Sequence, residues 1–190
     1  MIKLLYPYKR KTDEELMALV QGKQEGAFDE LWRRYSPAIH NFFFRRTAGN
    51  KDIAADLTQE VFMQLWNASH LYHYPNKLRP YLFTIAFNLV KNLYRDMDYF
   101  TSYEAEIRSL CEEAQEDDTL AKMDDKILFQ AINKSVEQLR EAEKLLFDLR
   151  FTDELTIKEI AEIIHIPEGT VKSRLHSLIQ KLRKNLYDYV

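Results

Sequence analysis

The sequence has little of what a disulfide-built, repetitive or membrane-spanning protein needs. It contains one cysteine, Cys111, so no disulfide can form within the chain. Four glycines and five prolines in 190 residues are too few for a collagen-like or low-complexity chain. No uncharged run approaches the roughly 18 residues that span a bilayer, and the apolar start before Lys9 is too short for a signal peptide. These absences predict a cytoplasmic protein without direct membrane insertion.

The sequence also lacks the signatures of catalysis and metal binding. It has no Gly-rich phosphate loop. His70 and His73 stand close together, but without a neighbouring cysteine or paired carboxylates they do not predict a zinc site. Cys111 lies among acids, which disfavours the reactive thiolate. We therefore expect no enzyme activity, no cofactor, no metal and no small-molecule substrate.

Charge is present but unevenly distributed. The net charge is only −3. Residues 96–125 nevertheless carry eleven acids against two cations, whereas residues 170–184 carry five cations and no acid. The acidic middle is typical of a linker with little core of its own, and the basic end is a candidate nucleic-acid surface.

Apolar residues recur at spacings of three and four along most of the chain, without a strand-like alternation, which predicts an all-α fold. Thr12 and Glu15 form a capping box that opens a helix over about 13–21. Pro37 should bend or end the next helix, and Asn50 can cap a third. Pro80 suits the first turn of a fourth. The predicted inward face of the third helix comprises Ile53, Leu57, Val61 and Leu65.

Two small helical domains are predicted. A basic tail over 1–11 precedes a first domain over 12–98. An acidic linker over 99–124 leads to a second domain over 125–190, which begins with a helix near Asp124.

The second domain ends in a predicted helix-turn-helix. Its helices span Ile157–Ile164 and about Glu168–Lys184, and the turn uses His165, a residue type enriched in the left-handed conformation, where glycine is usual. Val171, Leu175, Leu178 and Leu182 should face inward. Lys172, Ser173 and His176 should then face the major groove, flanked by Thr170 and Arg174, which suit phosphates. The alternative is a solvated basic face on an ordinary terminal helix.

Residues Leu155–His176, with Gly169-Thr170-Val171-Lys172-Ser173-Arg174 at their centre, resemble region 4 of extracytoplasmic-function (ECF) sigma factors of the sigma-70 family. The resemblance implies that this helix recognises the promoter −35 element. Lys172, Ser173 and His176 would contact bases, and Thr170 and Arg174 would contact the backbone.

Upstream, Asp56–Trp66 resembles sigma region 2.2, Pro80–Asn92 resembles regions 2.3 and 2.4, and Ala27–Trp32 matches the family's opening helix. The implied partners are core RNA polymerase, promoter DNA and an anti-sigma factor. The polymerase contacts would be Asp56, Gln59, Glu60 and Met63. A solvated helix face is the alternative for this stripe.

The resemblance also implies a pocket that captures a base of the melted −10 element. Aromatic and amide groups suit unpaired bases. The implied contacts are Tyr72, His73, Tyr74, Asn76, Lys77, Asn88, Lys91, Asn92 and Arg95. The tyrosines could instead pack beneath the loop. The chain departs from the family at Tyr81, where Trp is common, and at Thr84 and Phe87, where Arg is common, which weakens the case for phosphate contact by that helix.

Two other functions remain open on the residues alone. A stand-alone helix-turn-helix regulator would need an effector domain, and no strands are predicted for one. A protein-interaction adaptor with a vestigial DNA-binding helix is the second. A gel shift with and without core polymerase separates all three.

Overall fold

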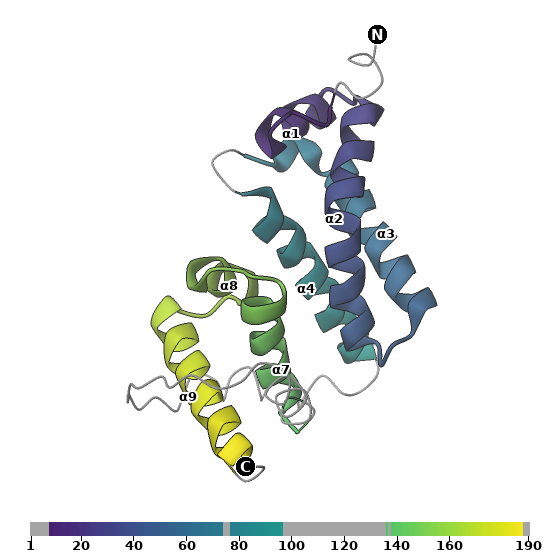
Figure 1. The fold of residues 1–190 in the computed structure, drawn as a ribbon. Coiled ribbons are helices and arrows are strands. Elements are labelled where there is room, and N and C mark those ends of the chain that lie inside the picture. Colours follow the sequence, from purple (N-terminus) through teal and green to yellow (C-terminus); the bar gives the residue numbers. More distant parts are fainter. Residues whose placement is uncertain (1–7, 74–76, 97–135, 137, 188–190) are drawn as a thin grey trace. The chain divides into compact units, whose positions relative to one another are not determined.

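The computed structural model describes residues 8–73, 77–96, 136 and 138–187, and every regular element in these ranges is helical (Figure 1). The predicted all-α fold is therefore confirmed. The chain divides into two compact units, residues 1–93 and 94–190. The predicted acidic linker and most of the helix predicted to begin near residue 124 lie outside the described residues. None of the helices in the described ranges combines the length and apolarity needed to cross a membrane.

The first unit consists of α1 (Asp13–Gln21), α2 (Glu25–Arg46), α3 (Lys51–Asn67), the short 3-10 turn η2 (Ser69–Leu71) and all but the last three residues of α4 (Leu78–Asp96). The predicted capping box opens α1: Glu15 N donates to Thr12 Oγ1 at 3.3 Å, and Thr12 N donates to Glu15 Oε2 at 2.8 Å. Asn50 caps α3 by accepting from the next two free amides, those of residues 52 and 53. Local signals thus set where these helices begin.

Buried aromatic rings join the helices of the first unit. The ring of Phe42 on α2 meets that of Phe83 on α4 edge to face, with centroids 5.5 Å apart. α2 packs against both α1 and α3, as Figure 1 also shows. α2 runs unbroken through Pro37, so of the two predicted outcomes, a bend or an end of the helix, the end is excluded. Residues buried on both sides of it, Leu31 and Ile39, stabilise the continuous helix against the lost hydrogen bond.

The buried face of α3 agrees only in part with the predicted one. Val61 and Leu65 are buried as predicted, Leu57 is half-buried, and the other buried residues are Ala54, Thr58 and Phe62. Ile53 is 39% exposed, so its assignment to the inward face is wrong. Because 3.6 residues make a helical turn, neighbouring residues point about 100° apart around the helix axis. Ile53 therefore points away from the core although Ala54, the next residue, is buried.

The second unit contains α7 (Glu141–Phe147), a π-helical turn η3 (Asp148–Thr152), α8 (Ile157–Ile164) and α9 (Glu168–Tyr187). An ion pair connects α7 to α9, because Lys181 Nζ lies 2.8 and 3.1 Å from the two carboxylate oxygens of Glu143. α8 has the bounds that the sequence predicts. The core of this unit is aliphatic, and it includes Leu145, Leu149, Ile160, Ile163 and Val171.

Candidate nucleic-acid and polymerase interfaces

Local hydrogen bonds define the helix-turn-helix of the second unit. At the start of α8, Glu159 N donates to Thr156 Oγ1 at 3.2 Å, and Thr156 N donates to Glu159 Oε2 at 2.9 Å. His165 ends α8 in the left-handed conformation, with φ 58° and ψ 45°. Ile166 N then donates to the carbonyl oxygen of Ala161 at 3.2 Å. This turn sets the direction in which α9 leaves α8.

The outward face of α9 presents polar groups near its N-terminus. The four residues predicted to face inward are all buried. Lys172 is exposed, and Thr170, Ser173 and His176 are half-buried. Ser173 Oγ donates to Thr170 O at 3.1 Å, and His176 Nε2 lies 2.9 Å from Gln180 Nε2. Gln180 is an addition to the predicted set, since it contacts a candidate base-contacting ring.

Arg174 lies on the other side of this helix. It is only 6% exposed. Residues 171, 174 and 178 follow one another at spacings of three and four, so Arg174 shares the buried face with Val171 and Leu178. The predicted phosphate contact by Arg174 does not fit this position, because its guanidinium is withdrawn from solvent. The prediction that Arg174 flanks the outward face did not take this spacing into account.

In the first unit, the predicted base-capturing loop begins with a buried ring. Tyr72 is 6% exposed, and its ring meets that of Tyr81 edge to face, with centroids 5.3 Å apart. The structure therefore buries the Tyr72 ring against Tyr81 of α4, and the predicted stacking of this ring on an unpaired base does not fit that position. His73 and Lys77 are exposed at the two ends of the loop. Tyr74 and Asn76 lie outside the described residues.

α4 contributes amides to the same region. Asn88 and Asn92 are exposed and lie one turn apart, and Lys91 Nζ is 5.7 Å from the centre of the Phe87 ring. Arg95 lies in the last turn of α4.

The two positions on α4 where the family commonly has Arg have structural explanations. Phe87 is 1% exposed and belongs to the core. Thr84 Oγ1 donates to Pro80 O at 2.9 Å. Neither position supplies a cation for phosphate.

The predicted polymerase stripe lies on α3. Asp56 and Gln59 are exposed, Met63 is 57% exposed, and half-buried Glu60 accepts from Gln64 Nε2 at 2.8 Å. The structure therefore brings the four predicted residues together on one helix, with one apolar side chain among polar ones.

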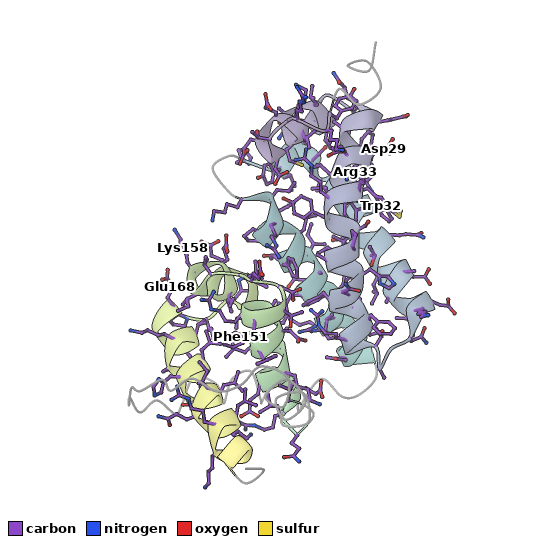
Figure 2. The ribbon with its side chains drawn as sticks, in the orientation of Figure 1. Asp29, Trp32, Arg33, Phe151, Lys158 and Glu168 are labelled. Atoms are coloured by element: carbon purple, nitrogen blue, oxygen red, sulfur yellow. The ribbon has the colours of Figure 1, made fainter. Side chains whose placement is uncertain are left out.

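α2 extends this stripe into a grooved face that the sequence argument missed. A hollow of about 360 Å³ is lined by Trp32, Ser36, Pro37, His40, Asn41, Ala55, Thr58 and Gln59. A second hollow, of about 470 Å³, is lined by Glu25, Phe28, Asp29, Met63, Trp66 and Asn67. Trp32 is 37% exposed, and its ring centre is 4.6 Å from that of Phe62. Figure 2 labels Asp29, Trp32 and Arg33 along α2. We call this surface the α2–α3 face.

An ion-pair cluster supports α2 beside this face. Glu30 is 7% exposed and accepts from Arg33 at 2.7 and 2.9 Å and from Arg34 Nε at 2.8 Å. The hydrogen bond from Arg33 and the one from Arg34 outweigh burial and lower the pKa of Glu30 to about 2. Arg34 also pairs with Asp13 at 2.9 Å, which ties α2 to the start of α1. Burial, together with the hydrogen bond to Asp13, raises the pKa of Tyr35.

The second unit has a comparable carboxylate. Burial raises the pKa of Glu143, but the hydrogen bonds from Lys181 and from the backbone amide of Arg140 outweigh it, so the pKa is lowered. Both units therefore contain a carboxylate whose charged form is stabilised by cations. The cations belong to the same helix for Glu30, whereas Lys181 of α9 pairs with Glu143 of α7.

Both units match regions of one protein family. Residues 31–98 match the model of sigma-70 region 2, and residues 136–184 match that of sigma-70 region 4. The chain is 28% identical over 178 residues to the ECF RNA polymerase sigma factor SigW of Bacillus subtilis, covering 89% of this chain and 94% of that one. It is 27% identical over 167 residues to RNA polymerase sigma factor YlaC of the same species, covering 86% and 94%. The chain belongs to the sigma-70 family, in its ECF group.

Solved structures share the fold. CnrH, in a complex with the cytosolic domain of CnrY, has a TM-score of 0.64 at 18% identity, covering 93% of this chain and 97% of CnrH. RpoE of Bartonella quintana, in a complex with the anti-sigma factor NepR, has a TM-score of 0.56 at 21% identity, covering 84% and 96%.

Proposed function

We propose that this protein is a sigma factor: it binds core RNA polymerase, recognises promoter −10 and −35 elements and promotes transcription initiation. The observation that carries the proposal is the match of both units, in order, to the two regions of one initiation-factor family. An exposed polar surface on each unit is consistent with it. A stand-alone regulator would require neither the region 2 match nor the α2–α3 face.

The −35 element is contacted by α9. Lys172 is exposed and His176 follows one turn later, so both side chains reach one groove of the DNA. Ser173 donates its own hydroxyl hydrogen to the helix backbone, which leaves its oxygen as an acceptor. Thr170, at the N-terminal end of α9, contacts a phosphate. Arg174 is excluded from this set by its burial, and we assign it a packing role.

The −10 element is held by the loop over residues 73–77 and by α4. Asn88 and Asn92 offer amide donors and acceptors that suit base edges. His73, Lys77 and Lys91 add an aromatic ring and two cations. Tyr74, Asn76 and Arg95 complete the proposed set. Tyr72 acts instead as the buried foundation of the loop.

Core polymerase binds the α2–α3 face. Its exposed Met63 and Trp32 supply apolar anchors, and Asp56, Gln59 and Glu60 supply a polar rim. An anti-sigma factor would inhibit the protein by covering such a surface. CnrH and RpoE, two of the proteins that share this fold, were both solved in complexes with protein partners.

The decisive experiment combines the purified chain, core polymerase and a library of duplexes with randomised −10 and −35 elements. We expect retained DNA and run-off transcripts only when both proteins are present. DNA retention by the chain alone would instead identify a stand-alone regulator. Failure of every duplex to be retained or transcribed with core would contradict the proposal.

A docking variant tests the α2–α3 face separately. Gln59→Ala with Glu60→Ala should weaken core binding, because it removes two rim groups, while helical content stays constant. Lys51→Ala changes an exposed residue at the start of the same helix and is the matched control. Equal affinity of the double variant and the control in a titration with core would exclude this part of the face.

A further inference from the structure

We propose that Gln21, the last residue of α1, is a positioning residue for promoter melting. It fixes the point at which the loop over residues 73–77 leaves the folded unit. The inference rests on the proposed role of that loop in holding the −10 element.

Gln21 joins two parts of the chain that are far apart in sequence. Its Nε2 donates to Ser69 O at 3.0 Å and to Tyr72 O at 2.8 Å, 48 and 51 residues away. Ser69 O also accepts from Tyr72 N at 3.1 Å. A single amide nitrogen therefore ties both ends of η2, and the second of these carbonyls belongs to the last residue before the loop.

Lys23 secures the segment just upstream. Its φ of 60° turns the chain after α1, and its Nζ then lies 3.0 Å from Trp66 O and 3.5 Å from Ser69 Oγ. The same ammonium stands 4.8 Å from the centre of the Trp66 ring. Carbonyls at the end of a helix lack intrahelical donors and favour a cation, so Lys23 completes the end of α3.

The buried Tyr72 ring fixes the loop from the other side. It packs edge to face on Tyr81, in the first part of α4, where the loop returns. Gln21 holds the backbone of Tyr72, and Tyr81 holds its ring. The loop thus starts from a fixed point relative to α4, which also carries Asn88.

Fixed ends matter because capturing an extruded base requires a prepared pocket. Unstacking a base costs a few kcal/mol, and a loop that must first be ordered adds its own entropy cost. Without Gln21, the carbonyls of Ser69 and Tyr72 lose their tertiary donor. The loop would then start from a less defined position, while the α2–α3 face and α9 keep their own contacts.

The test compares Gln21→Leu with Gln24→Leu in the full-length chain bound to core polymerase. Gln24 is an exposed glutamine three residues later, and its Oε1 accepts from Tyr8 OH at 3.3 Å. The probes are a duplex promoter that the wild-type holoenzyme opens and a single strand of its −10 element. We expect Gln21→Leu to lower permanganate-reactive thymines and single-strand affinity about tenfold, as loss of two hydrogen bonds implies. Core affinity and closed-complex formation should match those of Gln24→Leu.

Amide hydrogen exchange gives a readout that does not depend on promoter activity. Exchange at residues 70–73 should accelerate in Gln21→Leu and stay unchanged in Gln24→Leu. Gln21→Glu keeps the length of the side chain but loses the donor, so it should behave like Gln21→Leu.

Three outcomes would overturn the positioning role. If the Gln21→Leu holoenzyme opens the promoter as well as wild type does, Gln21 has no positioning role, and the proposed function stands. A parallel loss of helical content and core affinity in both Gln21 variants would make Gln21 a structural residue only. A wild-type holoenzyme that opens no promoter would remove the proposed function, and the positioning role with it.

Discussion

The two units present their proposed DNA contacts in different ways. In the second unit, a single helix, α9, carries the whole proposed −35 surface, and its direction is set by the turn at His165 just before it. In the first unit, the proposed −10 surface is divided between α4 and a loop whose start is held by Gln21 on α1. A helix displays its contacts by its own periodicity, whereas a loop needs donors supplied from distant parts of the chain.

Each unit also buries one residue expected to touch DNA. Arg174 is on the packed face of α9, and the Tyr72 ring is packed against Tyr81 of α4. Both residues sit directly beside more accessible candidates, the half-buried Ser173 and the exposed His73. In both units, a buried residue that supports the proposed contact surface is therefore adjacent in sequence to a residue of that surface.

The largest expected effect concerns the first unit. Asn88→Ala should lower open-complex formation by up to about a hundredfold, because an extruded base loses a partner that helps offset a few kcal/mol of unstacking. Core affinity and duplex binding should stay at wild-type values, since Asn88 lies outside α3 and α9. Permanganate footprinting measures the melted thymines. Normal melting in Asn88→Ala would exclude α4 as part of the pocket.

A smaller effect should separate Lys172 from Arg174. Lys172→Ala should change the ranking of −35 variants, because one good base contact contributes about 1–3 kcal/mol of discrimination. Arg174→Ala should instead lower the free energy of unfolding of the second unit by about 1–3 kcal/mol, since it removes a buried charged side chain and its interactions. The salt dependence of promoter binding should be the same in Arg174→Ala as in wild type.

Binding by the holoenzyme across salt concentrations and across the −35 library distinguishes the two roles. Equal loss by Lys172→Ala on every −35 sequence would contradict base contact. If Arg174→Ala is as stable as wild type but its promoter binding depends less on salt, Arg174 contacts a phosphate after all.

The sequence predicted the helices better than the surfaces. α1 and α8 have the predicted bounds because capping boxes and stop signals lie within a few residues of each helix end. The burial of Ile53 and Arg174 was mispredicted, since one residue of rotation decides which side of a helix meets its neighbours. The burial of Tyr72 depends on Tyr81, nine residues further on and across a loop.

Two functional features had no sequence signal. Gln21 is an ordinary polar residue at a helix end, and its partners are carbonyl oxygens 48 and 51 residues away. Trp32 occupies an apolar position of α2 that periodicity assigns to the core, yet it is 37% exposed. Which carbonyls Gln21 reaches, and how much of Trp32 stays exposed, are decided only when the helices pack against one another. The roles of the predicted contact residues stay predictions.

A stability measurement in acid should distinguish the two units. The folded pKa of Glu30, about 2, lies below its ordinary value of 4.5, so the unfolded state binds more protons between these values. Its contribution is fully present above about pH 4.5 and is lost as the pH falls towards about 2. Because its partner Arg33 is well exposed, we expect solvent-screened stabilisation of about 1–2 kcal/mol. Glu30→Gln should remove it at neutral pH.

Tryptophan fluorescence reports this transition selectively, because both tryptophans, Trp32 and Trp66, belong to the first unit. Glu14→Gln alters an exposed carboxylate of the same unit and is the control. Glu143→Gln should leave the fluorescence transition unchanged and destabilise the second unit, as followed by circular dichroism. Identical acid profiles for wild type and Glu30→Gln would show that the ion-pair cluster is energetically neutral.

The smallest effect compares glycine substitutions at two residues in the left-handed conformation, one in each unit. The change in the free energy of unfolding should have opposite signs at the two positions. His165 and Lys23 have φ values of 58° and 60°, a conformation that costs a side-chain-bearing residue about 1 kcal/mol. His165 is exposed, so His165→Gly should relieve this strain and, after the added entropy of unfolded glycine, raise the free energy of unfolding of the second unit by about 0.5 kcal/mol. Lys23→Gly relieves the same strain but loses the contacts with Trp66 O and the Trp66 ring, each contributing about 0.5–1 kcal/mol. It should therefore lower the stability of the first unit by about 0.5–1.5 kcal/mol. Urea unfolding followed by circular dichroism and by tryptophan fluorescence resolves the two units. Changes of the same sign in both variants would mean that backbone strain alone governs these turns, and that Lys23 does not hold the end of α3.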